Sequence, residues 1–340
     1  MYSTLRHIIL LMSAGWLLSS CTSDVLDGEN ITRGSEVQFS VSELSRATIT
    51  TSIDEFAVYG DMKFPVDNNT APMVIFDKTK VERSNNSWRY NGIQYWFPKH
   101  EHSFVAIHPL SVLEIGNNPR YAASKLSFTY TIPNKVSDRN AIADILAATH
   151  RRVYELDDPN NTTTFQFSHI MSLINFAPML DDDKMGEDSY IEFHNVVLSG
   201  LKSRATFNIT PAPRQTNLQT GDRVVEVTGL NGESELTINF ASPVKVVNGR
   251  KDVTLFDDND AIIMLPQTFD AASKAQILLT YSVNGNAEKK QVTIPLAESG
   301  GWESGKSYSY RFTISRTGVK VEATTITNWE VLTVGNVNAH

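Results

Sequence analysis

The chain has 340 residues, enough for about two domains that each bury a core of their own. Its formal net charge is −8 at pH 7, and 41% of its residues are hydrophobic, as is typical of a folded soluble protein. Nothing in this balance suggests the basic surface that nucleic-acid binding requires.

The first 20 residues have the order of a lipoprotein signal peptide. A positively charged start is followed by IILLMSAGWLL, an apolar run that is too short to span a bilayer as a helix. The run ends at Leu18-Ser19-Ser20-Cys21, which resembles a bacterial lipobox. We expect Cys21 to be acylated and to hold the mature chain in the outer membrane; the alternative is an incidental cysteine near an ordinary cleavage site. Cys21 is the only cysteine, so no intrachain disulfide is expected.

Residues 21–35 are polar and lack periodicity, as expected of a tether between a lipid and a domain. The acids Asp24, Asp27 and Glu29 resemble the acidic export signal of surface lipoproteins in some Gram-negative lineages. The folded part is therefore predicted to begin at residue 36.

Short alternating runs of apolar and polar residues follow along nearly the whole chain and predict strands. The first is EVQFSV, residues 36–41, and the clearest hairpin is residues 276–296, with Asn284-Gly285 at its turn. Residues 143–156 are compatible with one or two helical turns. The pattern predicts an all-β protein built from sandwich-type domains.

Five turn-forming residues in a row, Asp157 to Asn161, predict a linker. They divide the chain into an N-terminal domain, residues 36–158, and a C-terminal domain, residues 159–340. The polar stretch of residues 181–188 is the competing boundary. The first boundary is preferred because residues 164–176 look like the opening strand of the second domain.

The stretch GGWESGKS, Gly300 to Ser307, matches the phosphate-binding P-loop pattern. A P-loop needs a helix directly after it, but residues 308–314 alternate with the period of a strand. Glu303 also places a carboxylate where a phosphate would bind. We therefore expect a hairpin turn between residues 291–297 and 308–314, and no nucleotide binding.

Two groups of residues raise the question of a metal. His100 and His102 would share one face of a strand, but a zinc or copper site needs three or four convergent ligands. The acidic runs Asp181–Asp183 and Asp257–Asp260 lack the spacing of a calcium-binding EF-hand. Solvated turns explain both groups better. Since nucleophile motifs such as G-x-S-x-G are also missing, the sequence predicts no metal, no cofactor and no enzyme.

Several motifs occur in a characteristic order. They are Ser45-Arg46-Ala47-Thr48, FAVYG, Trp88-x-Tyr90-Asn91, Tyr95-Trp96-Phe97-Pro98, FVAIHP, Asp144-Ile145-Leu146-Ala147-Ala148, Phe167-Ser168-His169-Ile170-Met171-Ser172, Trp302-x-x-Gly305-Lys306-x-Tyr308-x-Tyr310-x-Phe312 and Ile326-x-x-Trp329. This order resembles the fimbrillin family, the type V pilins of anaerobic Gram-negative bacteria, across nearly the whole mature chain. The resemblance implies two transthyretin-like β-sandwich domains in tandem, export as a lipoprotein, and assembly by donation of a strand between subunits.

The resemblance also implies a processing site at Arg46-Ala47. An Arg-specific protease would cut there, remove the first strand (residues 36–41) and open a groove for a strand from another subunit. A cut at the rival site, Arg33-Gly34, would leave the strand in place. The alternative is that Arg46 is an ordinary surface arginine in a loop.

The predicted function is that of a structural fimbrial subunit at the cell surface with a role in adhesion. Its partners would be other fimbrial subunits, the Arg-specific protease and, through the lipid, the outer membrane. The alternative function is a non-polymerising surface lipoprotein that binds a glycan or another host ligand. Neither function involves a nucleic acid or a nucleotide.

Overall fold

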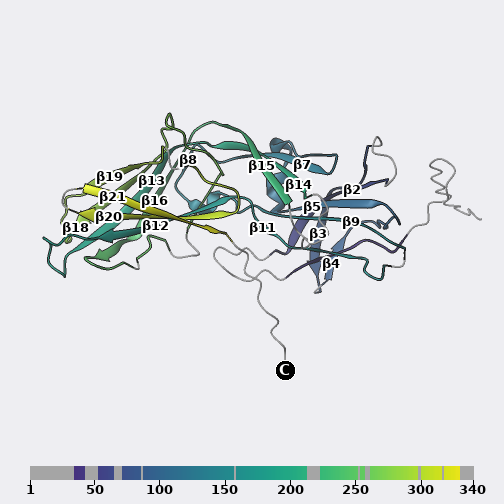
Figure 1. The fold of residues 1–340 in the computed structure, drawn as a ribbon, viewed down its shortest axis with the longest axis horizontal. Coiled ribbons are helices and arrows are strands. Elements are labelled where there is room, and N and C mark those ends of the chain that lie inside the picture. Colours follow the sequence, from purple (N-terminus) through teal and green to yellow (C-terminus); the bar gives the residue numbers. More distant parts are fainter. Residues whose placement is uncertain are drawn as a thin grey trace, which may run out of the picture. The chain divides into compact units, whose positions relative to one another are not determined.

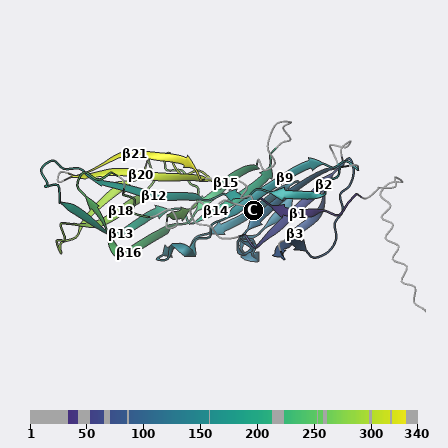
Figure 2. The same cartoon turned by 90° about the horizontal axis from the view of Figure 1, so that it is seen from below.

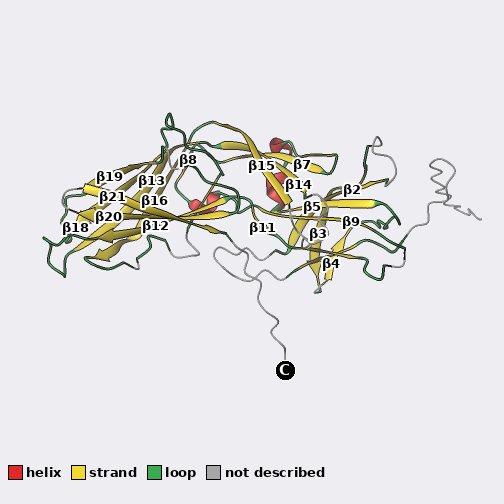
Figure 3. Cartoon of the chain, viewed as in Figure 1, coloured by secondary structure: helices red, strands yellow, loops and turns green. Residues whose placement is uncertain are grey.

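The computed structural model describes residues 34–42, 53–64, 71–85, 87–156, 158–212, 223–251, 253–256, 261–297, 300–315 and 318–329 (Figure 1). These residues form strands, loops and short 3-10 helices, with no α-helix among them (Figure 3). The 3-10 helices are η1 (Leu110–Leu113), η2 (Ile115–Asn117) and η3 (Arg139–Ala141). No helix in this part of the chain is long and apolar enough to cross a membrane. The predicted all-β class is confirmed.

Three sheets contain the strands of the first half of the chain except β8, together with β14 and β15. A six-stranded sheet has the order β11 (Ser168–His169), β9 (Leu146–Val153), β5 (Glu101–His108), β2 (Glu55–Lys63), β3 (Met73–Ser84), β4 (Ser87–Tyr90). A pair of parallel strands consists of β1 (Gln38–Val41) and β10 (Thr162–Phe165). A four-stranded sheet has the order β15 (Arg223–Asn231), β14 (Arg204–Pro211), β7 (Lys125–Thr131), β6 (Arg120–Ala122).

The remaining strands form two sheets that contribute to one apolar core. The first has the order β19 (Lys290–Pro295), β18 (Gln276–Val283), β13 (Tyr190–Leu201), β16 (Ser234–Val247), β8 (Lys135–Val136). The second has the order β17 (Ile262–Met264), β12 (Ser172–Leu180), β20 (Lys306–Ser315), β21 (Gly318–Asn328). Phe193 of β13 meets Phe312 of β20 edge to face, with 6.2 Å between the ring centroids. The predicted hairpin is present as β18–β19, and Asn284 and Gly285 take the positive φ angles that its turn needs.

The central strands β2, β5 and β9 of the six-stranded sheet are largely buried on both faces, whereas β3 and β4 at one edge are more exposed. In β2, Phe56 and Val58 point into an aromatic cluster shared with β1 and β10. Ala57 and Tyr59 point the other way, into the core shared with β7 and β14. The sheet is therefore the middle of three layers, and the β1–β10 pair covers one of its faces.

Two of the predicted elements are wrong. Residues 143–156 contain strand β9 and no helical turn, because the run of apolar residues is buried on both faces and a short run of that kind does not distinguish strand from helix. Residues 164–176 are not a single opening strand but contribute to β10, β11 and β12.

Strands from both sides of the predicted domain boundary share sheets. β7, which precedes the boundary, pairs with β14, and β10, which follows it, pairs with β1. The division into residues 36–158 and 159–340, and the transthyretin-like topology of each part, stay predictions.

Candidate functional site

Residues 34–42 lie between residues 94–96 on one side and β10 on the other, and we call the space that they occupy the groove. β1 pairs in parallel with β10, from Gln38 opposite Thr162 to Val41 opposite Phe165. On the other side, the Val37 N–H donates to the Gln94 carbonyl at 2.8 Å. The residues just before β1 are thus bonded to residues 94–96, and β1 itself, purple in Figure 2, pairs with β10.

The apolar side chains of β1 fill the floor of this groove. Val37 is fully buried, and Phe39 is 5% exposed. The Phe39 ring packs against four other rings, with centroid distances of 5.2–5.8 Å, and these belong to Phe76, Tyr90, Phe104 and Phe165. The neighbouring Gln38 is exposed. The predicted alternation of Val37, Phe39 and Val41 is confirmed: Val37 and Phe39 are buried, and Val41 is half-buried against the same cluster.

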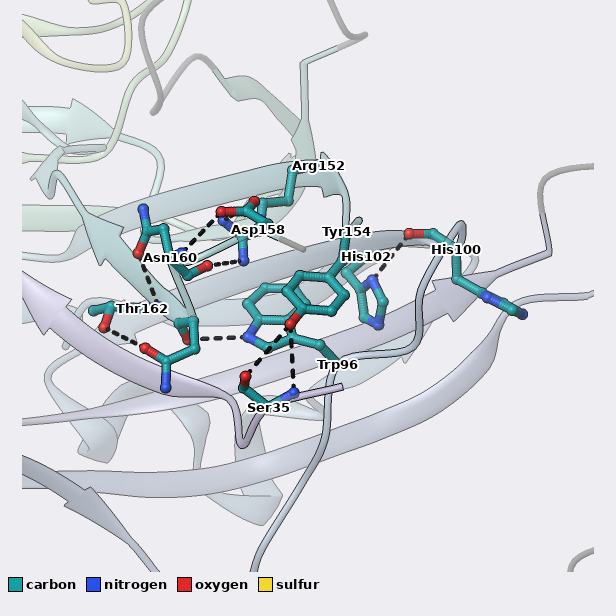
Figure 4. Close-up of polar contacts among 10 residues, drawn as sticks. Ser35, Trp96, His100, His102, Arg152, Tyr154, Asp158, Asn160 and Thr162 are labelled. Atoms are coloured by element: carbon teal, nitrogen blue, oxygen red, sulfur yellow. Dashed lines mark hydrogen bonds and ion pairs between the residues drawn. The ribbon is translucent and has the colours of Figure 1, made fainter. Parts of the chain in front are cut away.

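Trp96 is hydrogen-bonded to the start of the segment (Figure 4). Its backbone N–H donates to the Ser35 carbonyl at 3.0 Å, and its carbonyl accepts from the Gly34 N–H at 2.7 Å. The buried indole donates from Nε1 to the Asn161 carbonyl at 2.9 Å. The Tyr154 ring stacks on the indole with a centroid distance of 5.2 Å and an interplanar angle of 14°. One tryptophan therefore joins the N-terminal segment to the chain that enters β10.

The Arg152 guanidinium lies against both rings of this stack, with its carbon 5.5 Å from the centroid of the Tyr154 ring. The same carbon lies 4.1 Å from the centroid of the Trp96 ring. Nη2 donates to the Asn160 carbonyl at 2.6 Å, and Nη1 lies 3.5 Å from a carboxylate oxygen of Asp158. Burial lowers the pKa of Arg152, although the charge of Asp158 opposes this shift. The predicted linker is thus tied to the groove through its turn-forming residues.

The two histidines considered as metal ligands serve the local structure. His102 is fully buried, and its Nε2 accepts from the Phe97 N–H at 3.3 Å, so its Nδ1 donates to the His100 carbonyl at 3.1 Å. His100 Nδ1 lies 2.7 Å from the Pro98 carbonyl. Within the described ranges, no three His, Cys, Asp or Glu side chains converge as a metal site.

The buried histidines predict a loss of stability in mild acid. Burial lowers the pKa of His102 from 6.5 to about 4, although its hydrogen bond to the His100 carbonyl opposes this shift, and burial also lowers the pKa of His150 to about 4. The unfolded chain therefore binds more protons between pH 6.5 and 4, so the free energy of unfolding should fall as the pH falls through this window. One pKa unit corresponds to about 1.4 kcal/mol, so each histidine can account for about 3 kcal/mol.

Urea denaturation at pH 7.5, 6 and 5 measures this loss. His102→Gln keeps an acceptor and a donor but does not titrate, so its free energy of unfolding should depend less on pH than that of the wild type. His194→Gln is the matched control, since His194 is only partly buried. Equal pH dependence in wild type and His102→Gln would contradict the assignment.

The residues that the sequence singled out for processing, Cys21, Arg46 and Ala47, lie outside the described residues. The described chain leaves the groove at Ser42, whose N–H donates to the Phe165 carbonyl at 3.0 Å. It resumes at Ile53, which is buried in the same aromatic cluster as Phe39. Arg46 and Ala47 belong to the connection between these two points.

In the P-loop-like stretch, the backbone amides of Trp302, Glu303, Gly305 and Lys306 donate hydrogen bonds within the protein. The Glu303 N–H donates to the Tyr308 hydroxyl at 2.7 Å, and the Gly305 N–H donates to the Met171 carbonyl at 2.9 Å. A strand, β20, begins at Lys306, as predicted, instead of the helix that a P-loop needs. The predicted hairpin is wrong, however: β19 and β20 belong to different sheets, and β20 pairs with β12 and β21. Hydrophobic alternation identifies both strands but does not reveal their partners.

The sequence model of the family described as Fimbrillin-like matches residues 45–329. The chain belongs to the fimbrillin-like family. This is a structural and adhesion family and not an enzyme family, so the family predicted from the order of motifs is confirmed. No curated protein matched the sequence.

The chain is also similar to solved structures of fimbrial and putative cell adhesion proteins. A fimbrial protein from Bacteroides vulgatus ATCC 8482 is 15% identical, with a TM-score of 0.57 over 88% of this chain and 100% of that one. Putative cell adhesion proteins from Bacteroides ovatus ATCC 8483 and Bacteroides uniformis ATCC 8492 are each 18% identical, with TM-scores of 0.49 and 0.47. The alignments cover 89% and 87% of this chain and 100% and 99% of those proteins. At such low identity, the first likeness supports a shared fold.

Proposed function

We propose that this fimbrillin-like chain is a structural fimbrial subunit, exported as a lipoprotein through Cys21 and displayed at the cell surface with a role in adhesion. Membership of the Fimbrillin-like family supports the class of function. The observation that carries the assembly mechanism is the position of β1. Its Phe39 contacts rings from β3, β4, β5 and β10, yet β1 pairs only with β10 and is not part of the six-stranded sheet that contains β3, β4 and β5.

Cleavage at Arg46-Ala47 would separate residues 34–42, which include β1, from the rest of the chain; we call this segment the plug. Before cleavage, β1 occupies the groove at the high effective concentration of a tethered segment and blocks other strands. After cleavage, only non-covalent contacts hold residues 34–42. Its departure would expose the backbone of β10 and the aromatic pocket, a combination that accepts an added strand. A strand from another fimbrial subunit would then fill the groove.

Arg46→Ala should abolish assembly. The mature wild-type protein, treated with an Arg-specific protease, is expected to form fibres visible by negative-stain electron microscopy, whereas Arg46→Ala should stay monomeric because its plug stays covalently attached. Arg46→Lys should behave like Arg46→Ala, because the protease requires arginine although the charge is kept. Arg33→Ala is the matched control and should assemble like the wild type.

Sequencing of the protein in the fibres provides an independent readout, since its N-terminus should be Ala47. Fibres whose subunits begin at Cys21, or equal assembly of Arg46→Ala and wild type, would remove the cleavage mechanism. A cleaved protein that never assembles would favour the alternative of a non-polymerising surface lipoprotein that binds a glycan or host ligand.

Cys21→Ser should abolish lipidation. An acyl chain on Cys21 supplies the membrane attachment that is expected of a lipoprotein. Cells grown with a clickable palmitate analogue should label the wild type and not Cys21→Ser, and the variant should leave the membrane fraction. Ser20→Ala, next to the cysteine, is the matched control and should still be labelled. Persistent labelling of Cys21→Ser would disprove this anchor.

A further inference from the structure

We propose that the groove selects its incoming strand by two side chains: a glycine at the position of Gly34 and an aromatic residue at the position of Phe39. This inference rests on the proposed strand exchange and specifies the partner. The selected strand has the pattern G-x-x-[V/I]-x-[F/Y/W] and runs parallel to β10, as β1 does.

The requirement for glycine comes from a close approach to Tyr154. A Cβ atom at residue 34 would lie 2.4 Å from Cε1 of Tyr154 and 3.0 Å from the Trp96 carbonyl oxygen. The ring cannot easily move, because Tyr154 is 1% exposed and stacks on the buried Trp96. A larger residue at this position would break the hydrogen bonds between Gly34, Ser35 and the Trp96 backbone.

The requirement for an aromatic residue comes from the pocket around Phe39. Four rings surround it, and the stacked one, Phe165, lies on the partner strand β10 at 5.5 Å and 20°. A smaller side chain would leave a cavity among rings that are fixed by their own strands. The fully buried Val37, two residues earlier, sets the register between glycine and ring.

The occupant that fits is a strand from a different polypeptide that carries this pattern. Residues 330–340 of this chain contain one glycine, Gly335, and aligning it with Gly34 places Asn338 in the Val37 position and His340 in the Phe39 position. A polar amide in a dry apolar site is costly without a hydrogen-bonding partner. The groove therefore favours another kind of subunit over the 330–340 segment of a second copy.

Uptake of peptides by the cleaved protein tests this selection. The full mature chain carrying Cys21→Ser is treated with an Arg-specific protease in the presence of fluorescent peptides. The probes are residues 34–42, the same peptide with Phe39→Ala, Gly34→Ala or Gln38→Ala, and residues 330–340. Fluorescence that co-elutes with the protein reports uptake, and anisotropy gives the affinity.

The unchanged peptide and the Gln38→Ala control should bind equally, because Gln38 points to solvent. Phe39→Ala should bind about 100-fold more weakly, given the cost of emptying an aromatic pocket, and Gly34→Ala about tenfold more weakly. Residues 330–340 should not be taken up. Equal binding of all five peptides would overturn the selection while leaving strand exchange intact. If the cleaved protein keeps its own segment and takes up no peptide, the groove does not exchange, and both the inference and the proposed assembly fail.

Discussion

Phe39→Ala is expected to lower the free energy of unfolding of the intact chain by about 4 kcal/mol, the cost of removing a buried phenylalanine ring from a core. The ring packs against Phe76, Tyr90, Phe104 and Phe165, which come from four different strands. Because these strands fix their own side chains, the pocket cannot close around an alanine. Urea denaturation followed by tryptophan fluorescence measures the loss.

Gln38→Ala is the matched control, since it lies on the same strand but is exposed, and its free energy of unfolding should change by less than about 0.5 kcal/mol. Phe39→Leu keeps much of the apolar volume and should fall between the two. If the free energy of unfolding of Phe39→Ala lies within 1 kcal/mol of the wild-type value, β1 is not an integral part of this core and does not stably occupy the groove.

The sequence predicted which face of β1 is buried, because alternation along a strand directly reports the side that faces the core. It did not predict the partner of that strand. Gln38 pairs with Thr162, far along the chain, and no local pattern in either segment specifies the other. Parallel pairing of segments so distant in sequence depends on the layers that bring them together.

The sequence also did not predict that Trp96 binds the residues at the start of the groove. The predicted tether, residues 21–35, ends with Gly34 and Ser35, which the structure shows hydrogen-bonded to the backbone of Trp96. The one available signal was Trp96 itself, a large aromatic residue within Tyr95-Trp96-Phe97-Pro98. Its contacts with Tyr154 and Arg152 required the tertiary structure.

The closing region illustrates the same limit. Alternation after Ser307 correctly indicated a strand and so excluded a P-loop, but it could not show that β20 joins β12 and β21 and not β19. A strand pattern predicts an element and its buried face, whereas the choice of sheet depends on which neighbours cover that face.

Trp302→Ala should be as damaging as Phe39→Ala, with a loss of about 4 kcal/mol in the free energy of unfolding. Trp302 is 2% exposed, and its indole meets the Phe269 ring edge to face at 4.8 Å. Its Nε1 donates to the Tyr310 hydroxyl at 2.8 Å, so alanine removes a buried hydrogen bond as well as the ring. The loop cannot easily shift to fill the space, because the Trp302 backbone pairs with Gln267 in both directions.

Lys306→Ala separates this packing role from nucleotide binding, because it alters the residue that a P-loop needs most. In this protein, Lys306 Nζ donates to Asn328 Oδ1 at 2.6 Å in an exposed contact, so its loss should cost less than about 1 kcal/mol. Isothermal calorimetry with ATP should detect no binding in the wild type or in either variant, since the amides of Glu303 and Gly305 are used within the protein. Micromolar ATP affinity in the wild type that disappears in Lys306→Ala would restore the P-loop interpretation. A Trp302→Ala protein that is as stable as the wild type would show that the indole does not stabilise this turn.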